Sequence, residues 1–200
     1  MSAGALRREA DIERVRALAV ASGGRVGLVT TPSAGTPRFV VELDYVTSGS
    51  SRYPAERQAR SRVAIDLALR HPFDAPAARV LTPVFHPNVF PSGVVCLGSK
   101  WIPSEGMDLF VQRIARLLAY DPLLVNVHSV ANGAALQWYL ATSRLHPGAF
   151  PTDPAALALG KSDARVVRAC PHCQAQLRLP AGRSGRVQCP RCARSFETET

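Results

Sequence analysis

Residues 85–103 have the sequence FHPNVFPSGVVCLGSKWIP, and this stretch decides how the rest of the chain is interpreted. Asn88 precedes Cys96 by eight residues, and a Pro-Ser-Gly sequence lies between them. Proline, serine and glycine favour turns, so the segment is predicted to fold back on itself. The sequence therefore predicts a reactive thiol held beside an amide side chain.

This segment resembles the active-site segment of the ubiquitin-conjugating enzymes, which has His-Pro-Asn, a turn with Gly, an apolar pair, the reactive Cys and a Leu. The corresponding residues are His86, Pro87, Asn88, Ser92, Gly93, Val94, Val95, Cys96 and Leu97. The resemblance implies that Cys96 carries the C-terminal carboxyl of a ubiquitin-like modifier as a thioester and passes it to an amine, usually of a lysine. A thiolate is the nucleophile that such chemistry requires.

The resemblance also suggests roles for three polar residues. Asn88 either donates a hydrogen bond to the oxyanion formed during transfer or anchors its loop through backbone groups. His86 is assigned a structural hydrogen bond that shapes the loop rather than the role of general base. Ser129 stands where the family often has an acidic residue that handles the incoming lysine. Because serine is a favoured helix N-cap, capping is the alternative role of Ser129.

The pattern of apolar residues predicts an α+β fold. Helical spacing predicts an amphipathic helix before Gly23-Gly24, and period-two alternation predicts strands with turns between them. The predicted helices span residues 6–21, 107–120 and 129–145, and the predicted strands span residues 25–30, 39–45, 63–69 and 80–84. An N-terminal helix, a four-stranded antiparallel meander and C-terminal helices follow one another in the ubiquitin-conjugating fold, so the resemblance covers about residues 5–148.

Two surfaces are candidates for partners. The resemblance implies that the first helix docks an activating enzyme through its arginines, and a solvated helix face without a partner is the alternative. These arginines are Arg7, Arg8, Arg14 and Arg16. Phe73 and Pro103 stand where the family contacts ligases, although a phenylalanine at position 73 is also compatible with the core.

A second cysteine motif lies near the C-terminal end of the sequence. Its residues are Cys170, Cys173, Cys189 and Cys192. Two CxxC pairs separated by 15 residues are typical of a zinc ribbon, in which four sulfurs hold a structural zinc ion. Strands are predicted over residues 174–180 and 186–188, with Gly182 and Gly185 in the turn, and His172 is expected to face solvent. A redox CxxC pair is disfavoured because a second CxxC follows at ribbon spacing.

Composition favours a two-domain protein of the cytoplasm. The chain has 200 residues, and 46% of them are hydrophobic, but it has no continuous apolar stretch of membrane-spanning length and no signal-peptide pattern. We expect a catalytic domain at residues 1–150, a linker at residues 151–164 and a zinc ribbon at residues 165–200. The net charge is +9, of which residues 161–200 contribute +5, from eight basic and three acidic residues. The composition and the fused ribbon suggest a bacterial conjugation system.

Three other functions remain open. A cysteine hydrolase would need a base near Cys96, and His86 and His128 are the nearest candidates in sequence. A non-catalytic conjugating-fold scaffold would not need the retained Cys96 and Asn88. Nucleic-acid binding through the basic ribbon is possible but disfavoured as the function of the whole chain.

Overall fold

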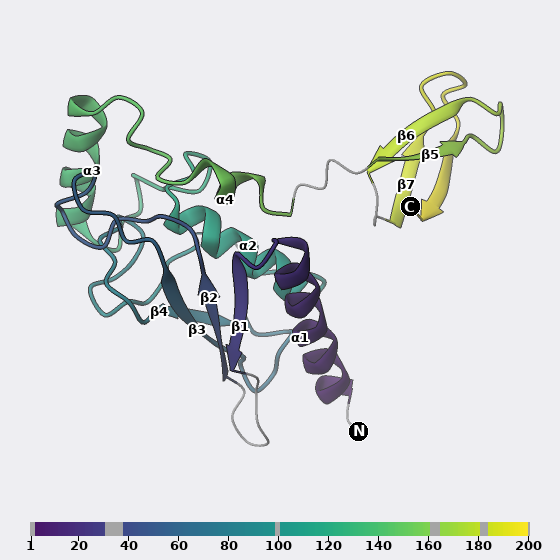
Figure 1. Cartoon of the computed structure of the whole chain (residues 1–200). Coiled ribbons are helices and arrows are strands. Elements are labelled where there is room, and N and C mark those ends of the chain that lie inside the picture. Colours follow the sequence, from purple (N-terminus) through teal and green to yellow (C-terminus); the bar gives the residue numbers. More distant parts are fainter. Residues whose placement is uncertain (1–2, 31–37, 99–100, 161–164, 181–183, 200) are drawn as a thin grey trace. The chain divides into compact units, whose positions relative to one another are not determined.

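The structure is a computed structural model that describes residues 3–30, 38–98, 101–160, 165–180 and 184–199. The chain divides into two compact units, Met1–Gly160 and Lys161–Thr200 (Figure 1). Residues 31–37, where a turn is predicted between the first two strands, and the predicted turn residue Gly182 lie outside the described residues. No helix in the described part of the chain is long and apolar enough to cross a membrane.

The larger unit contains the predicted four-stranded antiparallel sheet. Its strands, in spatial order, are β1 (Val26–Thr30), β2 (Arg38–Leu43), β3 (Ser61–Asp66) and β4 (Ala77–Val80). In β2 and β3, Phe39 pairs with Ile65 and Val41 pairs with Val63, and all four side chains are buried. Alternate residues of a strand point to the same face, so this pairing creates one apolar face on the sheet.

Two strand predictions need correction. The third predicted strand ends at Asp66, and Leu69, assigned to its buried face, is 92% exposed because it lies in the turn that follows. The fourth strand covers Ala77–Val80 rather than residues 80–84. Leu81 still donates a hydrogen bond of 2.8 Å to the carbonyl oxygen of Arg62, but Pro83 has no amide hydrogen with which to continue the pairing.

Two helices complete the main core. They are α1 (Ala3–Ala21) and α2 (Met107–Leu118), which contact each other. Ile12, Val15 and Leu18 of α1 are buried, as their spacing predicts, and they belong to the same apolar cluster as the inner residues of β2 and β3. After α1 the chain turns through Gly23 and Gly24, both of which have positive φ angles, as expected for glycines after a helix.

The later helices differ from the predictions at their boundaries. Helix α3 spans Gly133–Leu145, and its N-cap is Asn132, whose side chain accepts a hydrogen bond from the amide of Ala135. The predicted start at Ser129 was therefore wrong. The expected linker also begins too early, because helix α4 (Pro154–Ala158) contacts α2 and buries Ala156 in the core. Residues 151–160 thus belong to the larger unit.

The smaller unit consists of two β-hairpins (Figure 1). Its strands are β5 (Arg165–Ala169), β6 (Gln176–Pro180), β7 (Ser184–Gln188) and β8 (Ser195–Glu199). β5 pairs with β6 and β7 pairs with β8, both antiparallel. Gly185, predicted in a turn, instead lies within β7 opposite Thr198.

Candidate active site and metal centre

Cys96 lies at the end of a small hairpin that follows Asn88. Val89 and Val95 form an isolated antiparallel bridge, and the amide of Cys96 donates a hydrogen bond of 2.8 Å to the carbonyl oxygen of Asn88. The predicted fold-back is therefore present, and the Cys96 side chain is partly exposed. Cys96 is thus neither fully buried nor fully exposed, and its backbone is held close to that of Asn88.

The tip of this hairpin requires glycine at position 93. Gly93 has a φ angle of 86°, and a Cβ atom there would lie 2.4 Å from the carbonyl oxygen of Val80. The Gly93 carbonyl also accepts a hydrogen bond of 2.9 Å from the amide of Val80. The hairpin that carries Cys96 is therefore attached to the end of β4 through a contact that only glycine permits.

Asn88 is buried, and its side-chain amide is fully used within the protein. The Nδ2 group donates to the carbonyl oxygens of Asn126 (2.9 Å) and Ser129 (3.1 Å). The Oδ1 atom accepts a hydrogen bond of 2.9 Å from the amide of Asn126. These contacts join the Cys96 hairpin to the segment between α2 and α3, so the geometry supports the anchoring role.

His86 is completely buried beneath the same loop. Its Nδ1 atom accepts a hydrogen bond of 3.0 Å from the amide of Asn88, and its ring lies 4.3 Å from the ring of Tyr120. Burial lowers the pKa of His86 to about 3, so the imidazole stays neutral at physiological pH. An imidazole with so low a pKa is too weak a base to act as a general base at neutral pH.

Ser129 is exposed and does not cap a helix. Its carbonyl oxygen accepts the hydrogen bond from Asn88, and its amide donates to Oδ1 of Asn126 at 3.0 Å. Asn126 Oδ1 also accepts from the amide of His128 at 2.9 Å. The sequence prediction missed Asn126, although asparagine in a loop after a helix often makes such local bonds.

A cavity of about 190 Å³ lies beside the hairpin. Its lining includes Val95, Leu97 and Trp101. Among the described residues of this lining, Arg113 is the only one with an ionisable side chain, and it forms an ion pair of 2.6 Å with Glu105.

The candidate partner residues occupy different environments. All three arginines form ion pairs within the chain, Arg7 and Arg14 with Asp11 and Arg16 with Glu13, but the side chain of Arg7 is 23% exposed whereas those of Arg14 and Arg16 are about half exposed. Phe73 is 71% exposed, so the alternative in which it fills the core was wrong. Pro103 is also exposed.

Sequence reasoning also missed a buried polar cluster at α1. Asp11 and His71 are both buried, and Nε2 of His71 lies 2.8 Å from Oδ2 of Asp11. Asp11 stands four residues before Val15 and seven before Leu18, which places it beside the apolar stripe of the helix. A carboxylate on this apolar stripe was the signal that the sequence offered.

The four cysteines of the smaller unit form a compact cluster. All four sulfur atoms lie within 4.8 Å of one another, with Cys170 Sγ at 3.8 Å from Cys192 Sγ and Cys173 Sγ at 3.7 Å from Cys189 Sγ. A tetrahedral zinc site with Zn–S bonds of about 2.3 Å has S–S edges of about 3.8 Å. The sulfur arrangement therefore fits a metal ion of this size. His172 is exposed, as predicted, with its ring 6.5 Å from that of Phe196.

Known proteins match the larger unit in sequence. The sequence model of the family described as ubiquitin-conjugating enzyme matches residues 57–144. Ubiquitin-conjugating enzyme E2 T of Mus musculus is 35% identical over 101 residues, which cover 45% of this chain and 49% of that protein. The Bos taurus protein of the same name is 29% identical over 92 residues, covering 40% of this chain and 47% of that protein. The chain thus spans just under half the length of these two curated relatives.

A solved structure agrees in fold. S. cerevisiae Ubc12 superimposes with a TM-score of 0.51 and 18% sequence identity, covering 79% of this chain and 77% of that one. At this identity the likeness concerns the fold alone. The matched segment of residues 57–144 includes the hairpin from Asn88 to Cys96 and the segment that Asn88 anchors. Part of the larger unit is therefore similar in sequence to the ubiquitin-conjugating enzyme family, and the larger unit shares the fold of a ubiquitin-conjugating protein.

Proposed function

We propose that this protein carries a ubiquitin-like modifier as a thioester on Cys96 and transfers it to an amine of a substrate. The observation that carries the proposal is the partly exposed Cys96 at the end of a hairpin whose other strand bears the buried, anchored Asn88. A carrier cysteine must reach two macromolecular partners in turn. A thiol at the surface of a fixed loop meets this requirement.

In the first step, the Cys96 thiolate attacks the thioester that joins the modifier to an activating enzyme. The new bond forms between Cys96 Sγ and the modifier carbonyl carbon, and the activating enzyme leaves as a thiolate. The proton lost from Cys96 passes to solvent or to that leaving thiolate. Transfer of the modifier from one thiol to another requires little driving force, because one thioester replaces another.

In the second step, a substrate amine attacks the same carbonyl carbon. A C–N bond forms, the C–S bond breaks, Cys96 leaves as a thiolate and the amine gives up a proton. Ser129 has no carboxylate to accept that proton, so we assign its removal to solvent or to the substrate itself. A neutral serine at this position distinguishes this chain from relatives with an acidic residue there.

Asn88 contributes to this step first as an anchor. Both hydrogens of its Nδ2 group are donated to the carbonyl oxygens of Asn126 and Ser129. A role as oxyanion donor requires exchange of one of these bonds, and the longer bond to Ser129 is the one we expect to be exchanged. Loss of an oxyanion donor typically slows a reaction about 100-fold to 1,000-fold.

The proposal is tested by incubating the full chain with an activating enzyme, ATP and a ubiquitin-like modifier. We expect an adduct on Cys96 that is cleaved by a thiol reductant. Cys96→Ser is expected to give a reductant-resistant oxyester, and Cys96→Ala is expected to give no adduct. An adduct that persists in Cys96→Ala would overturn the assignment. No adduct in the wild-type chain with cognate partners would favour a scaffold.

A cysteine hydrolase is less compatible with the site. His86 is buried with a pKa of about 3, which removes one of the two candidate bases. Among the described residues, no side-chain hydrogen bond joins Cys96 to a histidine. A hydrolase would require such a base to activate its nucleophile.

For the smaller unit, we propose that the four cysteines bind a structural zinc ion. Their sulfurs occupy all four positions of a tetrahedral site, so no position remains for a catalytic water. A bound zinc ion would stabilise the two hairpins, which have only a small apolar cluster of their own. We further propose that this zinc ribbon recruits a substrate or another protein partner to the conjugating unit.

A further inference from the structure

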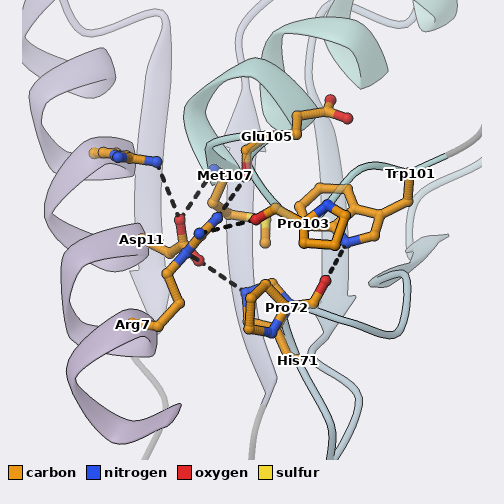
Figure 2. Close-up of polar contacts among 9 residues, drawn as sticks. Arg7, Asp11, His71, Pro72, Trp101, Pro103, Glu105 and Met107 are labelled. Carbon is orange, nitrogen blue, oxygen red and sulfur yellow. Dashed lines mark hydrogen bonds and ion pairs between the residues drawn. The ribbon is translucent and has the colours of Figure 1, made fainter. Parts of the chain in front are cut away.

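Arg7 was expected to dock the activating enzyme, but its guanidinium group forms hydrogen bonds with other groups of its own chain. Its Nε atom donates to Oδ2 of Asp11 at 2.8 Å. Its two terminal nitrogens donate to the carbonyl oxygens of Pro103 (2.9 Å) and Glu105 (2.6 Å). Figure 2 shows the Arg7 side chain extending from α1 toward the segment before α2.

Asp11 also contacts the chain at the end of this segment, where α2 begins. Its Oδ1 atom accepts a hydrogen bond of 3.3 Å from the amide of Met107, the first residue of α2. Its Oδ2 atom contacts Arg7 and the buried His71 (Figure 2). Burying a carboxylate without partners costs free energy. Loss of one contact of Asp11 is therefore expected to weaken the others.

A tryptophan links the segment to the turn that contains Phe73. Nε1 of Trp101 donates a hydrogen bond of 2.6 Å to the carbonyl oxygen of Pro72 (Figure 2), and its ring lies 5.7 Å from that of His71. Ile102, next to Trp101, is 57% exposed, and Phe73, next to Pro72, is 71% exposed. The two exposed apolar side chains therefore flank a hydrogen bond between two loops.

We propose that Arg7 and Asp11 are positioning residues that fix the segment from Trp101 to Gly106, rather than docking contacts for an activating enzyme. Arg7 satisfies two carbonyl groups of that segment, and a partner that recruited its guanidinium would have to break these bonds. By this proposal, docking on α1 uses Arg14 and Arg16, whose side chains are half exposed although they also form ion pairs with Asp11 and Glu13. Arg7 instead keeps Ile102 and Pro103 in place beside the turn of Phe73.

The part of this inference that concerns transfer rests on the proposed function. If the exposed side chains at Phe73, Ile102 and Pro103 contact a ligase, loosening the segment lowers ligase-dependent transfer from Cys96. Loading of Cys96 by the activating enzyme depends on other contacts. If Arg7 instead docks the activating enzyme, its substitution lowers the loading of Cys96 and leaves transfer from loaded Cys96 unchanged.

The test compares Arg7→Ala and Arg7→Lys with Arg16→Ala as the matched control on the same helix. Lysine keeps the positive charge but not the planar fork that reaches Asp11 and two carbonyl groups at once. Each variant is made with Trp138→Phe, so that Trp101 is the only tryptophan that remains. Acrylamide quenching of Trp101 fluorescence reports the position of the segment, and far-UV circular dichroism verifies folding.

We expect both Arg7 variants to raise the quenching constant of Trp101 by about twofold or more, as for a segment that opens locally, and Arg16→Ala to leave it unchanged. In loading assays, the KM for the activating enzyme is expected to stay within about twofold of wild type in Arg7→Ala. Unchanged quenching in both Arg7 variants would overturn the proposal. A raised KM that Arg7→Lys restores would overturn it as well.

Two further outcomes separate the two proposals. If Arg7→Ala does not fold, Arg7→Lys alone decides, because its charge is retained while the fork is lost. If the wild-type chain forms no adduct on Cys96, the proposed function fails, but the fluorescence measurement still tests whether Arg7 and Asp11 hold the segment.

Discussion

Asn88 and Asn126 form a reciprocal pair of hydrogen bonds between a side chain and a backbone. Asn88 Nδ2 donates to the carbonyl oxygen of Asn126 and Asn88 Oδ1 accepts from its amide, each at 2.9 Å. The Asn88 side chain thus bonds both the amide and the carbonyl group of Asn126, as the backbone of a neighbouring strand would. The segment between α2 and α3 is thereby attached to the hairpin that carries Cys96.

This pair allows the anchoring and chemical roles of Asn88 to be separated. Asn88→Ala removes three hydrogen bonds and is expected to lower the free energy of unfolding by about 3 kcal/mol. Asn126→Ala loosens the same segment by removing bonds to the amides of His128 and Ser129, but it leaves the amide of Asn88 intact. Chemical denaturation and single-turnover transfer from loaded Cys96 measure the two effects.

If Asn88 donates to the oxyanion, Asn88→Ala slows transfer by a further factor of about 100 relative to Asn126→Ala. Equal transfer rates in the two variants would show that Asn88 acts only as an anchor.

Gly93 is predicted to tolerate no side chain. Gly93→Ala would place a Cβ atom 2.4 Å from the Val80 carbonyl oxygen at a φ angle of 86°. We expect a loss of more than about 2 kcal/mol in unfolding free energy, together with altered alkylation of Cys96. Gly23→Ala is the matched control, because Gly23 also has a positive φ angle but has nothing within 4 Å of its added Cβ. Similar losses in both variants would mean that the positive φ angle, and not the close approach of the Cβ atom to the Val80 carbonyl oxygen, causes the loss of stability.

His86 makes the fold sensitive to acid. Its folded-state pKa of about 3 lies below the ordinary value of 6.5, so between these values the unfolded chain binds the extra proton. This contribution to stability is present above pH 6.5 and is lost as the pH falls toward 3. The slope is at most about 1.4 kcal/mol per pH unit.

His86→Asn keeps an acceptor for the Asn88 amide but cannot titrate. We expect its stability to fall less steeply than that of the wild type between pH 6.5 and pH 3, as measured by urea unfolding. His146→Asn, at an exposed position, serves as the control. Parallel pH profiles for His86→Asn and the wild type would contradict this assignment.

Asn132, not Ser129, is predicted to stabilise the start of α3. Asn132→Ala removes the hydrogen bond from the amide of Ala135 and is expected to cost about 1 kcal/mol. Ser129→Ala keeps the carbonyl that accepts from Asn88, so its thermal midpoint should stay close to that of the wild type. A larger loss in Ser129→Ala would restore a structural role for that hydroxyl group.

If the four cysteines bind zinc as proposed, removal of the metal is expected to unfold the smaller unit alone. Chelation of the full chain should abolish the protection of residues 165–199 in amide hydrogen exchange and leave residues 3–160 protected, because the larger unit has its own core. Cys173→Ser should abolish stoichiometric zinc binding, whereas Cys96→Ala should leave the zinc content unchanged. Retention of one zinc per chain in Cys173→Ser would contradict the four-sulfur site.

The amino-acid sequence alone determined the elements whose signals are local. Apolar alternation at Phe39, Val41 and Leu43 specified a strand with one buried face, and the spacing of Ile12, Val15 and Leu18 specified the inner face of α1. The two CxxC pairs predicted the sulfur cluster, because each pair forms its own knuckle. Periodicity and short spacing are properties of neighbouring residues, so they can be recognised without knowledge of the fold.

Only the tertiary structure decided contacts between residues distant in sequence. It showed that Asn88 holds residues 126–129, that His86 is buried against Tyr120, and that Arg7 contacts the carbonyl groups of Pro103 and Glu105. A polar residue in a sequence has the same hydrogen-bonding groups whether it faces solvent or the interior. Its partners and its burial are set by the packing of other elements, and these determine whether it docks another protein or holds its own chain in place.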